Sequence, residues 1–382
     1  MDRTFTLTRA AALDHLARVA PRTGTAYAAR RNTDAGPDAE PTTTALSPYL
    51  RRRLLLEPEV IAAAAEAHGP DAREKFVEEV FWRTYFKGHL ETHPALWSRY
   101  LDLVADGRNQ LATQSGLRRV FADAVAGNTG IDGFDDWAKQ LVETGWLHNH
   151  TRMWFASIWI FTLRLPWALG ADFFLRHLID GDPASNTLSW RWVAGLHTRG
   201  KAYVARADNI RRYTEGRFSP SGLDEDPAPL EETELARTVP LPPAGQPPQG
   251  DVALLLHLDD LNPETLDLGT ARITAIGGLL AHAPGAVDRV RHADEQAMDD
   301  TLTRAAARFG CPARRVEAAE DWTGGAPVVT AWAPVGPSAA ALPAGCTQLR
   351  RPFDELAWPR ATRGYFQVKT AIPGILRALG QP

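Results

Sequence analysis

Length, composition and charge exclude several classes of protein. The chain has 382 residues, of which 44% are hydrophobic and 23% charged, values typical of a folded globular protein. This length favours two domains over one. The formal net charge of -4 argues against a protein that coats nucleic acid through bulk positive charge, although a local basic cleft remains compatible with it.

Cysteine content and apolar runs indicate where the protein works. Cys311 and Cys346 are too few for a disulfide framework, a cysteine-ligated zinc site or a four-cysteine iron–sulfur cluster. Residues 1–19 carry charges throughout and lack the apolar core of a signal peptide. The apolar run 153–163 is too short to cross a bilayer. We therefore expect a cytoplasmic protein without a membrane segment.

Helical spacing of apolar residues dominates the first part of the chain. A short entry helix is predicted within residues 8–31 and ends at Pro21, and a loop rich in Asp, Pro and Thr follows. Further helices are predicted over residues 58–68, 72–92, 116–126, 132–144, 150–165 and 171–178. No convincing strand pattern occurs before residue 218.

The pattern changes after residue 218. Residues 219–250 are rich in Pro, Asp and Glu, and their prolines forbid a regular helix, so we predict an interdomain linker. Strand patterns then occupy residues 252–256, 272–277, 314–318 and 328–333, with a helix over residues 286–309. The predicted fold is multi-domain: an all-helical domain (1–218), the linker, and a small C-terminal α/β domain (251–382) with a mainly parallel sheet.

Two polar clusters, residues 144–153 and 178–186, flank an apolar run at residues 154–161. Buried Asn, Arg and Asp side chains cost free energy unless each has a partner, so these clusters need a polar network of their own or a large cofactor. A polar loop at residues 42–47 adds hydroxyls ahead of a helix. Such a loop suits a pyrophosphate, and it equally suits a simple helix cap.

The ordered set of short motifs resembles the FAD-binding domain of the photolyase and cryptochrome family over residues 11–218. The residues that carry the resemblance are Tyr27, Arg31, Thr43, Thr44, Leu46, Ser47, Glu79, Trp82, Arg83, Thr129, Gly130, Gln140, Leu141, Trp146, His148, Asn149, Arg152, Met153, Trp167, Asp180, Gly181, Asp182, Asn186, Trp190 and Trp192. The resemblance implies a helical domain that holds FAD in a bent conformation.

The resemblance also implies roles in cofactor binding. It places five residues around the phosphates and the ribityl chain: Tyr27, Thr43, Thr44, Ser47 and Arg83. It adds Arg31, Leu46 and Trp146 to the residues that would bind the cofactor. Asn149 and Asp182 would face the flavin, Arg152 would pair with Asp180 beside the ring, and Asn186 would face flavin N5. An amide can accept from a protonated N5 or donate to an oxidised one. The Arg152 and Asp180 pair could also be a structural ion pair between helices.

In repairing members of the family, light-excited reduced FAD donates an electron to a pyrimidine dimer flipped out of DNA. The resemblance therefore implies DNA photolyase-like repair, with damaged DNA as a partner in the flavin cavity. The implied catalytic residues are Glu79, Trp82, Met153, Asn186, Trp190 and Trp167. The first three match lesion contacts, and core packing or a solvated carboxylate would explain them equally well.

Trp190 and Trp167 match the two inner members of the family's electron-transfer chain. Residues 102–129 contain no Trp for the outer member, and Trp137, Trp154 and Trp159 are candidates to replace it. Buried aromatic residues at helical spacing are also ordinary core residues, so this interpretation has a structural alternative.

Other positions depart from the repair pattern. His150 replaces an expected Arg, and residues 195–203 differ from the segment that lines the DNA side of the cavity in relatives. A basic rim for phosphates, or an ordinary solvated face, is formed by Arg199, Lys201, Arg206, Arg211 and Arg212. The alternatives to repair are a non-repairing blue-light photoreceptor and a flavoenzyme that acts on a small molecule.

Domain order is the last departure. Family members carry an α/β domain before the FAD domain, whereas here the α/β pattern comes last. Residues 364–373 look like the end of that domain in the family, and residues 252–262 look like its first strand and turn. We therefore hypothesise that the α/β domain has been permuted to the C-terminus.

Overall fold

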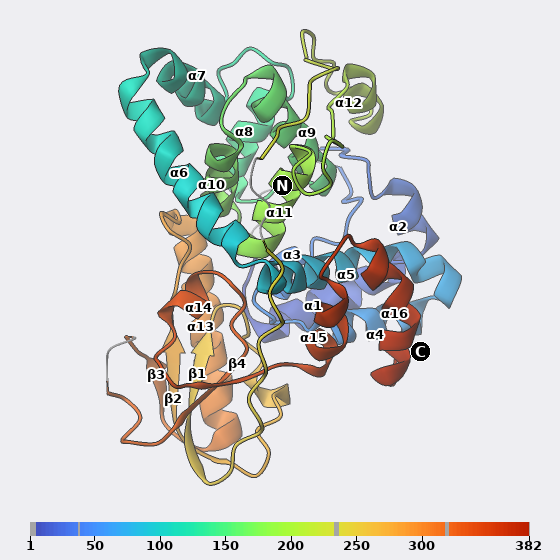
Figure 1. The fold of residues 1–382 in the computed structure, drawn as a ribbon. Coiled ribbons are helices and arrows are strands. Elements are labelled where there is room, and N and C mark those ends of the chain that lie inside the picture. The colour runs from blue at the N-terminus through green and yellow to red at the C-terminus, as the bar shows by residue number, and fades with distance from the viewer. Residues whose placement is uncertain (1–4, 37–38, 233–236, 318–320, 382) are drawn as a thin grey trace. The chain divides into compact units, whose positions relative to one another are not determined.

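The computed structural model describes residues 5–36, 39–232, 237–317 and 321–381. The chain divides into two compact units (Figure 1). The first unit contains Ala26–Ala45 and Pro94–Arg237, and the second contains Phe5–Thr25, Leu46–His93 and Thr238–Pro382. The second unit therefore combines part of the predicted helical region with the predicted α/β region. Among the described residues, no helix has the length and apolar character needed to cross a membrane.

The first unit is helical. Its elements are α2 (Thr25–Arg30), α6 (Ala95–Thr113), α7 (Ser115–Ala126), α8 (Phe134–Thr144), α9 (Asn149–Ser157), a π-helical turn (Ile158–Thr162), α10 (Trp167–His177), α11 (Pro183–Val193) and α12 (Ala207–Tyr213). Gly127 and Gly145 end α7 and α8 in the left-handed conformation, with φ of 64° and 69°. The helix predicted over residues 150–165 is α9 followed by the π-helical turn.

The second unit joins helices to a sheet. Its helices are α1 (Arg9–Val19), α3 (Ser47–Arg51), α4 (Glu57–Ala67), α5 (Pro70–Thr92), α13 (Asp288–Phe309), α14 (Pro337–Ala341), α15 (Pro352–Ala357) and α16 (Phe366–Ala378), with short 3-10 turns at Ala20–Arg22, Pro263–Thr265 and Trp358–Arg360. Its strands are β1 (Asp251–His257), β2 (Arg272–Leu279), β3 (Ala313–Arg315), β4 (Val328–Ala331) and β5 (Thr347–Leu349).

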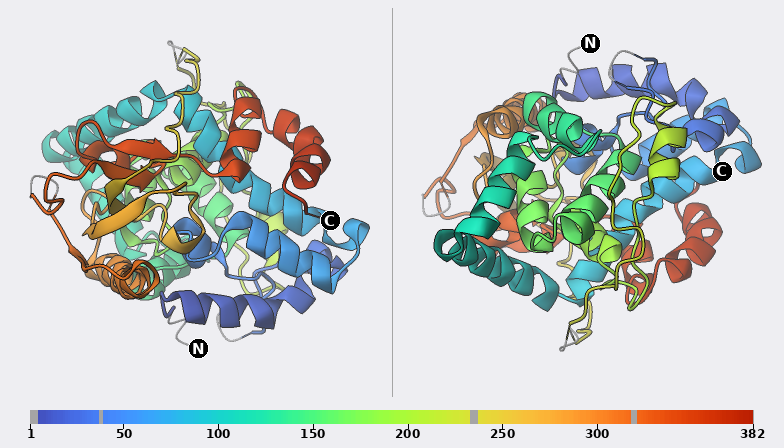
Figure 2. Two further views of the ribbon diagram at one scale, coloured as in Figure 1. Left: turned by 90° about the horizontal axis from the view of Figure 1, so that it is seen from below. Right: turned by 90° about the horizontal axis from the view of Figure 1, so that it is seen from above.

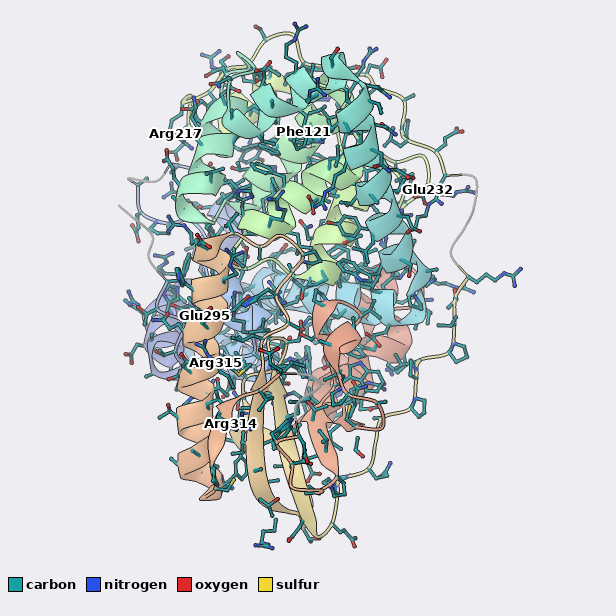
Figure 3. All side chains as sticks on the ribbon, turned by 90° about the vertical axis from the view of Figure 1, so that its left-hand side faces the viewer. Phe121, Arg217, Glu232, Glu295, Arg314 and Arg315 are labelled. Carbon is teal, nitrogen blue, oxygen red and sulfur yellow. The ribbon has the colours of Figure 1, made fainter. Side chains whose placement is uncertain are left out.

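The five strands form one sheet in the order β3-β2-β1-β4-β5, and every neighbouring pair is parallel. The α/β pattern with a parallel sheet is thus confirmed. Strand β3 ends at Arg315, and Ala318, the end of the strand predicted there, lies outside the described residues. Helix α13 packs along β2 and β3 (Figure 2). Arg315 on β3 pairs with Asp299 on α13 over 2.6 Å, close to Glu295 of the same helix (Figure 3).

Strand order reverses between β1 and β4, and the carboxyl ends of strands at such a point usually border a ligand crevice. Asp259 and Asp260 follow β1 there and are buried. Their partners are arginines of the same unit, Arg51 on α3 and Arg53 just after it. Arg51 Nη1 donates to Asp259 Oδ1 over 2.6 Å, and Arg53 Nη1 lies 3.4 Å from Asp260 Oδ2. Both carboxylates at this end of the sheet are therefore paired with arginines of the chain itself.

Further ion pairs extend this buried cluster. Arg52 Nε donates to Asp294 Oδ1 on α13 over 2.9 Å, and Arg53 Nη2 donates to Asp354 Oδ2 on α15 over 2.6 Å. Arg351 also pairs with Asp260, and its Nη2 donates to Asp260 Oδ1 over 2.7 Å. Burial raises the pKa of Asp260, but the charge of Arg351 more than offsets this effect and holds the pKa at about 2. Because a buried carboxylate without its cation is costly, the three consecutive arginines fix α3 against the sheet and its helices.

The cluster predicts a large loss of stability when one arginine is removed. Arg53→Met should lower the free energy of unfolding by about 3–5 kcal/mol, because Asp354 stays buried and loses the guanidinium that donates to it. The matched control is Arg272→Met, which breaks an exposed pair with Asp251 and should leave stability unchanged. Urea unfolding followed by circular dichroism measures both, and equal small effects would contradict this account of the cluster.

Candidate functional site

The two polar clusters of the sequence lie side by side in the first unit. Ile179 N donates to Gly145 O over 2.9 Å and ties the segment before α11 to the segment before α9. Arg152 on α9 donates through Nη2 to Asp180 Oδ2 over 2.9 Å and through Nε to Leu147 O over 3.0 Å. The Asp180 side chain is 2% exposed. The pairing predicted for these two residues is therefore present, and a structural and a cofactor-facing role are both compatible with it.

The two clusters also begin the helices that follow them. His148 precedes α9, and its Nδ1 accepts from His150 N over 3.1 Å. Asp182 precedes α11, and its Oδ1 accepts from Ser185 N over 2.7 Å. Each side chain satisfies a backbone donor in the first turn of a helix, which fixes where that helix begins. Asp182, predicted to face the flavin, thus has one carboxylate oxygen committed to a helix cap.

Asn186 lies in the first turns of α11 and is 9% exposed. Its Nδ2 donates to Ala171 O on α10 over 2.8 Å, so its Oδ1 is the atom that remains available to accept from a ligand. The neighbouring Ser185 Oγ is buried and, within the described part of the chain, has no hydrogen-bond partner. Because a buried hydroxyl without a partner is costly, a polar ligand group would suit this part of α11.

A small hollow of about 30 Å³ opens within the first unit. Its lining comprises Asp34, Ala35, Gly36, Glu40, Pro41, Thr42, Thr43, Gln140, Thr144, Trp146 and His148. Thr42 Oγ1 lies 3.3 Å from His148 Nε2. The carboxylate of Asp34 is engaged by Thr151 Oγ1 over 2.8 Å and by Arg217 over 3.2 Å (Figure 3). The hydroxyls, the amide and the indole around this hollow are groups that can hydrogen-bond to the uncharged polar parts of a flavin nucleotide.

The remaining predicted cofactor residues are divided between the two units. In the first unit, Tyr27 lies on α2, Arg31 N donates to Tyr27 O over 2.8 Å, and Thr44 is buried. Asn149 is the first residue of α9. The second unit holds Leu46 and Ser47 at the start of α3, and Glu79, Trp82 and Arg83 on α5.

Trp190, predicted as the inner member of an electron relay, is buried and packs edge-to-face on Trp159, with ring centroids 6.2 Å apart. Trp159 in turn packs on Phe121 at 5.7 Å (Figure 3). The other two candidate outer residues, Trp137 and Trp154, stack on each other at 5.6 Å. Among the three sequence candidates, Trp159 is therefore the one with a ring contact to Trp190 in the described residues.

Sequence reasoning missed a second aromatic path. The ring of Trp167 lies 6.0 Å from that of Tyr100, which lies 5.1 Å from that of Trp97. Both partners belong to α6, a helix that the sequence analysis did not predict, and their spacing of three residues is the signal that could have found them. The Arg191 guanidinium lies 5.8 Å from the Trp167 ring centroid, within the range of a cation–π contact.

The first part of the predicted linker packs on the first unit. Glu232 accepts from Arg191 in a bidentate ion pair of 2.7 and 2.6 Å (Figure 3). Burial raises the pKa of Glu232, but the Arg191 pair lowers it below its usual value. Leu230 N donates to Ala194 O over 2.9 Å, and Arg199 Nη2 donates to Glu232 O over 3.0 Å. Arg199, predicted as part of a basic rim, thus contacts the chain's own acidic segment.

Comparison with known proteins identifies the class of the helical region. The family model described as the FAD binding domain of DNA photolyase matches residues 76–221. The chain is 34% identical over 186 residues to a deoxyribodipyrimidine photo-lyase of Streptomyces griseus, a match that covers 44% of this chain and 38% of that protein. It is 32% identical over 202 residues to an enzyme of the same name from Thermus thermophilus, covering 50% of this chain and 47% of that protein.

A structural comparison finds a bacterial class III photolyase from Agrobacterium tumefaciens with a TM-score of 0.43 and 27% identity, covering 54% of this chain and 44% of that one. The chain thus spans less than half the length of these relatives. The helical fold and the matched domain define an FAD-binding flavoprotein. Residues 76–221 are thus a photolyase-type FAD-binding domain, and FAD is its cofactor.

His150, one of the departures from the repair pattern, generates a pH prediction. Burial, followed by the nearby charge of Arg31, lowers the pKa of His150 to about 4. Its ring packs on Trp154 at 4.8 Å and on Tyr213 at 5.5 Å. Because the folded-state pKa lies below the unfolded value of about 6.5, the stability held by the neutral ring is present above pH 6.5. It is lost as the pH falls toward 4.

We therefore expect the urea midpoint to fall between pH 6.5 and pH 4 and to fall less in His150→Gln. Buried His177 also has a lowered pKa, so the difference between the two proteins is the quantity that reports His150. Titration by NMR should place the His150 ring near pH 4, and a midpoint near 6.5 would contradict the burial argument.

Proposed function

We propose that this FAD-binding protein is a light-dependent DNA-repair enzyme that splits pyrimidine dimers. The observation that carries the proposal is the arrangement on α9 and α11, where the Arg152 and Asp180 pair and the Asn186 amide lie inside a photolyase-type FAD domain. The relatives reported above are named deoxyribodipyrimidine photo-lyases, which supports the same reaction class.

The cofactor, when bound, supplies light absorption and one-electron transfer. The residues of this chain would set the charge around it. Arg152, oriented by Asp180, favours negative charge on a nearby ring. One N–H of the Asn186 amide donates to Ala171 O, and its Oδ1 would accept a hydrogen bond from flavin N5–H. Thr43 and Trp146 would contact the cofactor from the hollow in the first unit.

The substrate would be a pair of bases flipped out of the duplex, because stacked bases cannot reach a buried flavin. Trp82 on α5 and Met153 on α9 are both partly exposed and would offer flat and flexible apolar surfaces to the bases. Glu79, one turn before Trp82 on α5, would offer a carboxyl group to their polar edges. Electron supply from outside would run through Trp190 and Trp167, with Trp159 or the pair of Tyr100 and Trp97 beyond them.

A second candidate function is a non-repairing blue-light photoreceptor. The acidic segment that includes Glu232 supports this function. The Glu232 carboxylate accepts from Arg191, and the Glu232 backbone oxygen accepts from Arg199. Phosphates that approached this face would have to displace a bidentate ion pair. A receptor could instead use light to release this segment. A change of charge near the ion pair of Arg191 and Glu232 would weaken that pair.

Replacement of Asn186 tests its predicted position at the flavin. In Asn186→Asp the donor to Ala171 O is lost and a carboxylate enters a buried site, so light should accumulate the reduced flavin that is protonated at N5. The matched control is Asn209→Asp, where the side-chain Oδ1 only accepts from Trp154 Nε1 and Asp can still accept. Visible absorption during illumination measures the effect, and identical spectra for Asn186→Asp and the wild type would count against the assignment.

Illumination with damaged DNA separates the two functions. The purified protein would be reduced, mixed with an oligonucleotide that contains one thymine dimer, and kept in blue light or in darkness. Dimer splitting that requires light supports repair. Light-driven change of the flavin spectrum without splitting supports the photoreceptor, and bound FAD with neither response points to dark chemistry on a small molecule.

A further inference from the structure

The indole of Trp82 has one face covered by the C-terminal part of the chain. The Tyr365 ring stacks on it with centroids 3.7 Å apart and planes 14° from parallel. Tyr85 stands edge-on to both rings, 5.6 Å from Trp82 and 5.5 Å from Tyr365. Phe86 approaches Trp82 at 5.4 Å with a tilt of 38°. One face and part of the edge of the indole are thus held by protein rings.

Trp82 nevertheless stays partly exposed. Within the described part of the chain, its ring contacts are those with Tyr85, Phe86 and Tyr365. Because the described rings approach one face and the edge of the indole, the partial exposure leaves room for a ligand at the other face. Such a face, flat and apolar with an N–H at its rim, suits a flat aromatic ring with polar edges.

Two contacts to α5 hold Tyr365 in place. Its hydroxyl donates to Glu78 O over 2.7 Å, and Lys369, one turn further along α16, pairs with Glu78 Oε1 over 2.8 Å. Burial raises the pKa of Tyr365, so the hydroxyl keeps its proton and remains a donor. Helices α15 and α16 both pack on α5 within the second unit (Figure 1). The stack is therefore anchored through the backbone of the helix that carries Trp82.

We propose that Tyr365 is a positioning residue that fixes the Trp82 indole, so that its second face is a rigid stacking platform for a nucleobase. The proposal rests on the proposed function, because the base that it places on Trp82 is one of the two flipped bases. It assigns a role at the substrate site to residues 364–369, close to the C-terminus. A preformed platform binds more tightly than a mobile indole, because the ring is already ordered before the ligand arrives.

The test compares Tyr365→Ala, Tyr365→Phe and a matched control, Phe366→Ala, in the full-length protein. Phe366 is the next residue and is 72% exposed, so its removal should change neither readout. Tyr365→Phe keeps the stacked ring and loses only the hydroxyl. The first readout is the near-ultraviolet circular dichroism of Trp82, defined as the band that Trp82→Phe removes. Tyr365→Ala should lose this band, and Tyr365→Phe should keep it.

The second readout is affinity for a short single-stranded oligonucleotide that contains a thymine dimer. Tyr365→Ala should raise Kd roughly two- to tenfold, because binding must then order an indole that is no longer held in place. FAD content should stay unchanged, which separates positioning from a general loss of structure. Tyr365→Phe should restore the affinity.

An unchanged Kd and an unchanged Trp82 band in Tyr365→Ala would overturn the proposal. Tighter binding by Tyr365→Ala would also overturn it, because Tyr365 would then cover the ligand face instead of backing it. If the wild-type protein binds no dimer-containing DNA, the proposed function fails, and the Trp82 band still decides whether Tyr365 fixes the indole.

Discussion

The run of three buried arginines at the end of α3 is the constraint on which the second unit depends. Arg51, Arg52 and Arg53 each reach a different acidic residue, and these acids belong to segments far apart in the sequence. A buried charge tolerates no misplacement of its partner, so the three pairs fix α3 against the turn after β1, α13 and α15 at once. The same unit carries α5, and therefore Trp82 and its anchored partner Tyr365.

The first unit also contains buried polar side chains that need partners. Polar side chains interrupt its apolar helices, and part of their need is met within the protein by the Arg152 and Asp180 pair and by the cap that Asp182 forms. Some polar groups of this unit remain without a partner inside the described part of the protein. Asn186 uses one N–H of its amide on Ala171 O, and its Oδ1 is available to accept, while Ser185 Oγ is buried without a partner in the described residues. A bound flavin could give such polar groups a hydrogen-bond partner, whereas without a partner their burial costs free energy.

The sequence predicted those elements whose signal is local. The α7, α8 and α13 helices and the strands β1 and β2 follow from periodicity, and the pairing of Arg152 with Asp180 followed from the family resemblance. It missed α6, whose polar residues dilute the apolar spacing, and β5, which has three residues. It also missed contacts that depend on tertiary folding, such as Glu232 on Arg191 inside a proline-rich segment and Tyr365 on Trp82. Such partners carry no signal in sequence spacing.

The most direct test of the account is the flavin content of the purified protein. The buried polar groups of the first unit predict one FAD per chain, released on denaturation, with weaker retention in Arg152→Met because Asp180 then lacks its cation. Quantitative absorption of the released cofactor against protein concentration gives the ratio. A protein that emerges without flavin, and that takes up none when FAD is added, would contradict the central claim.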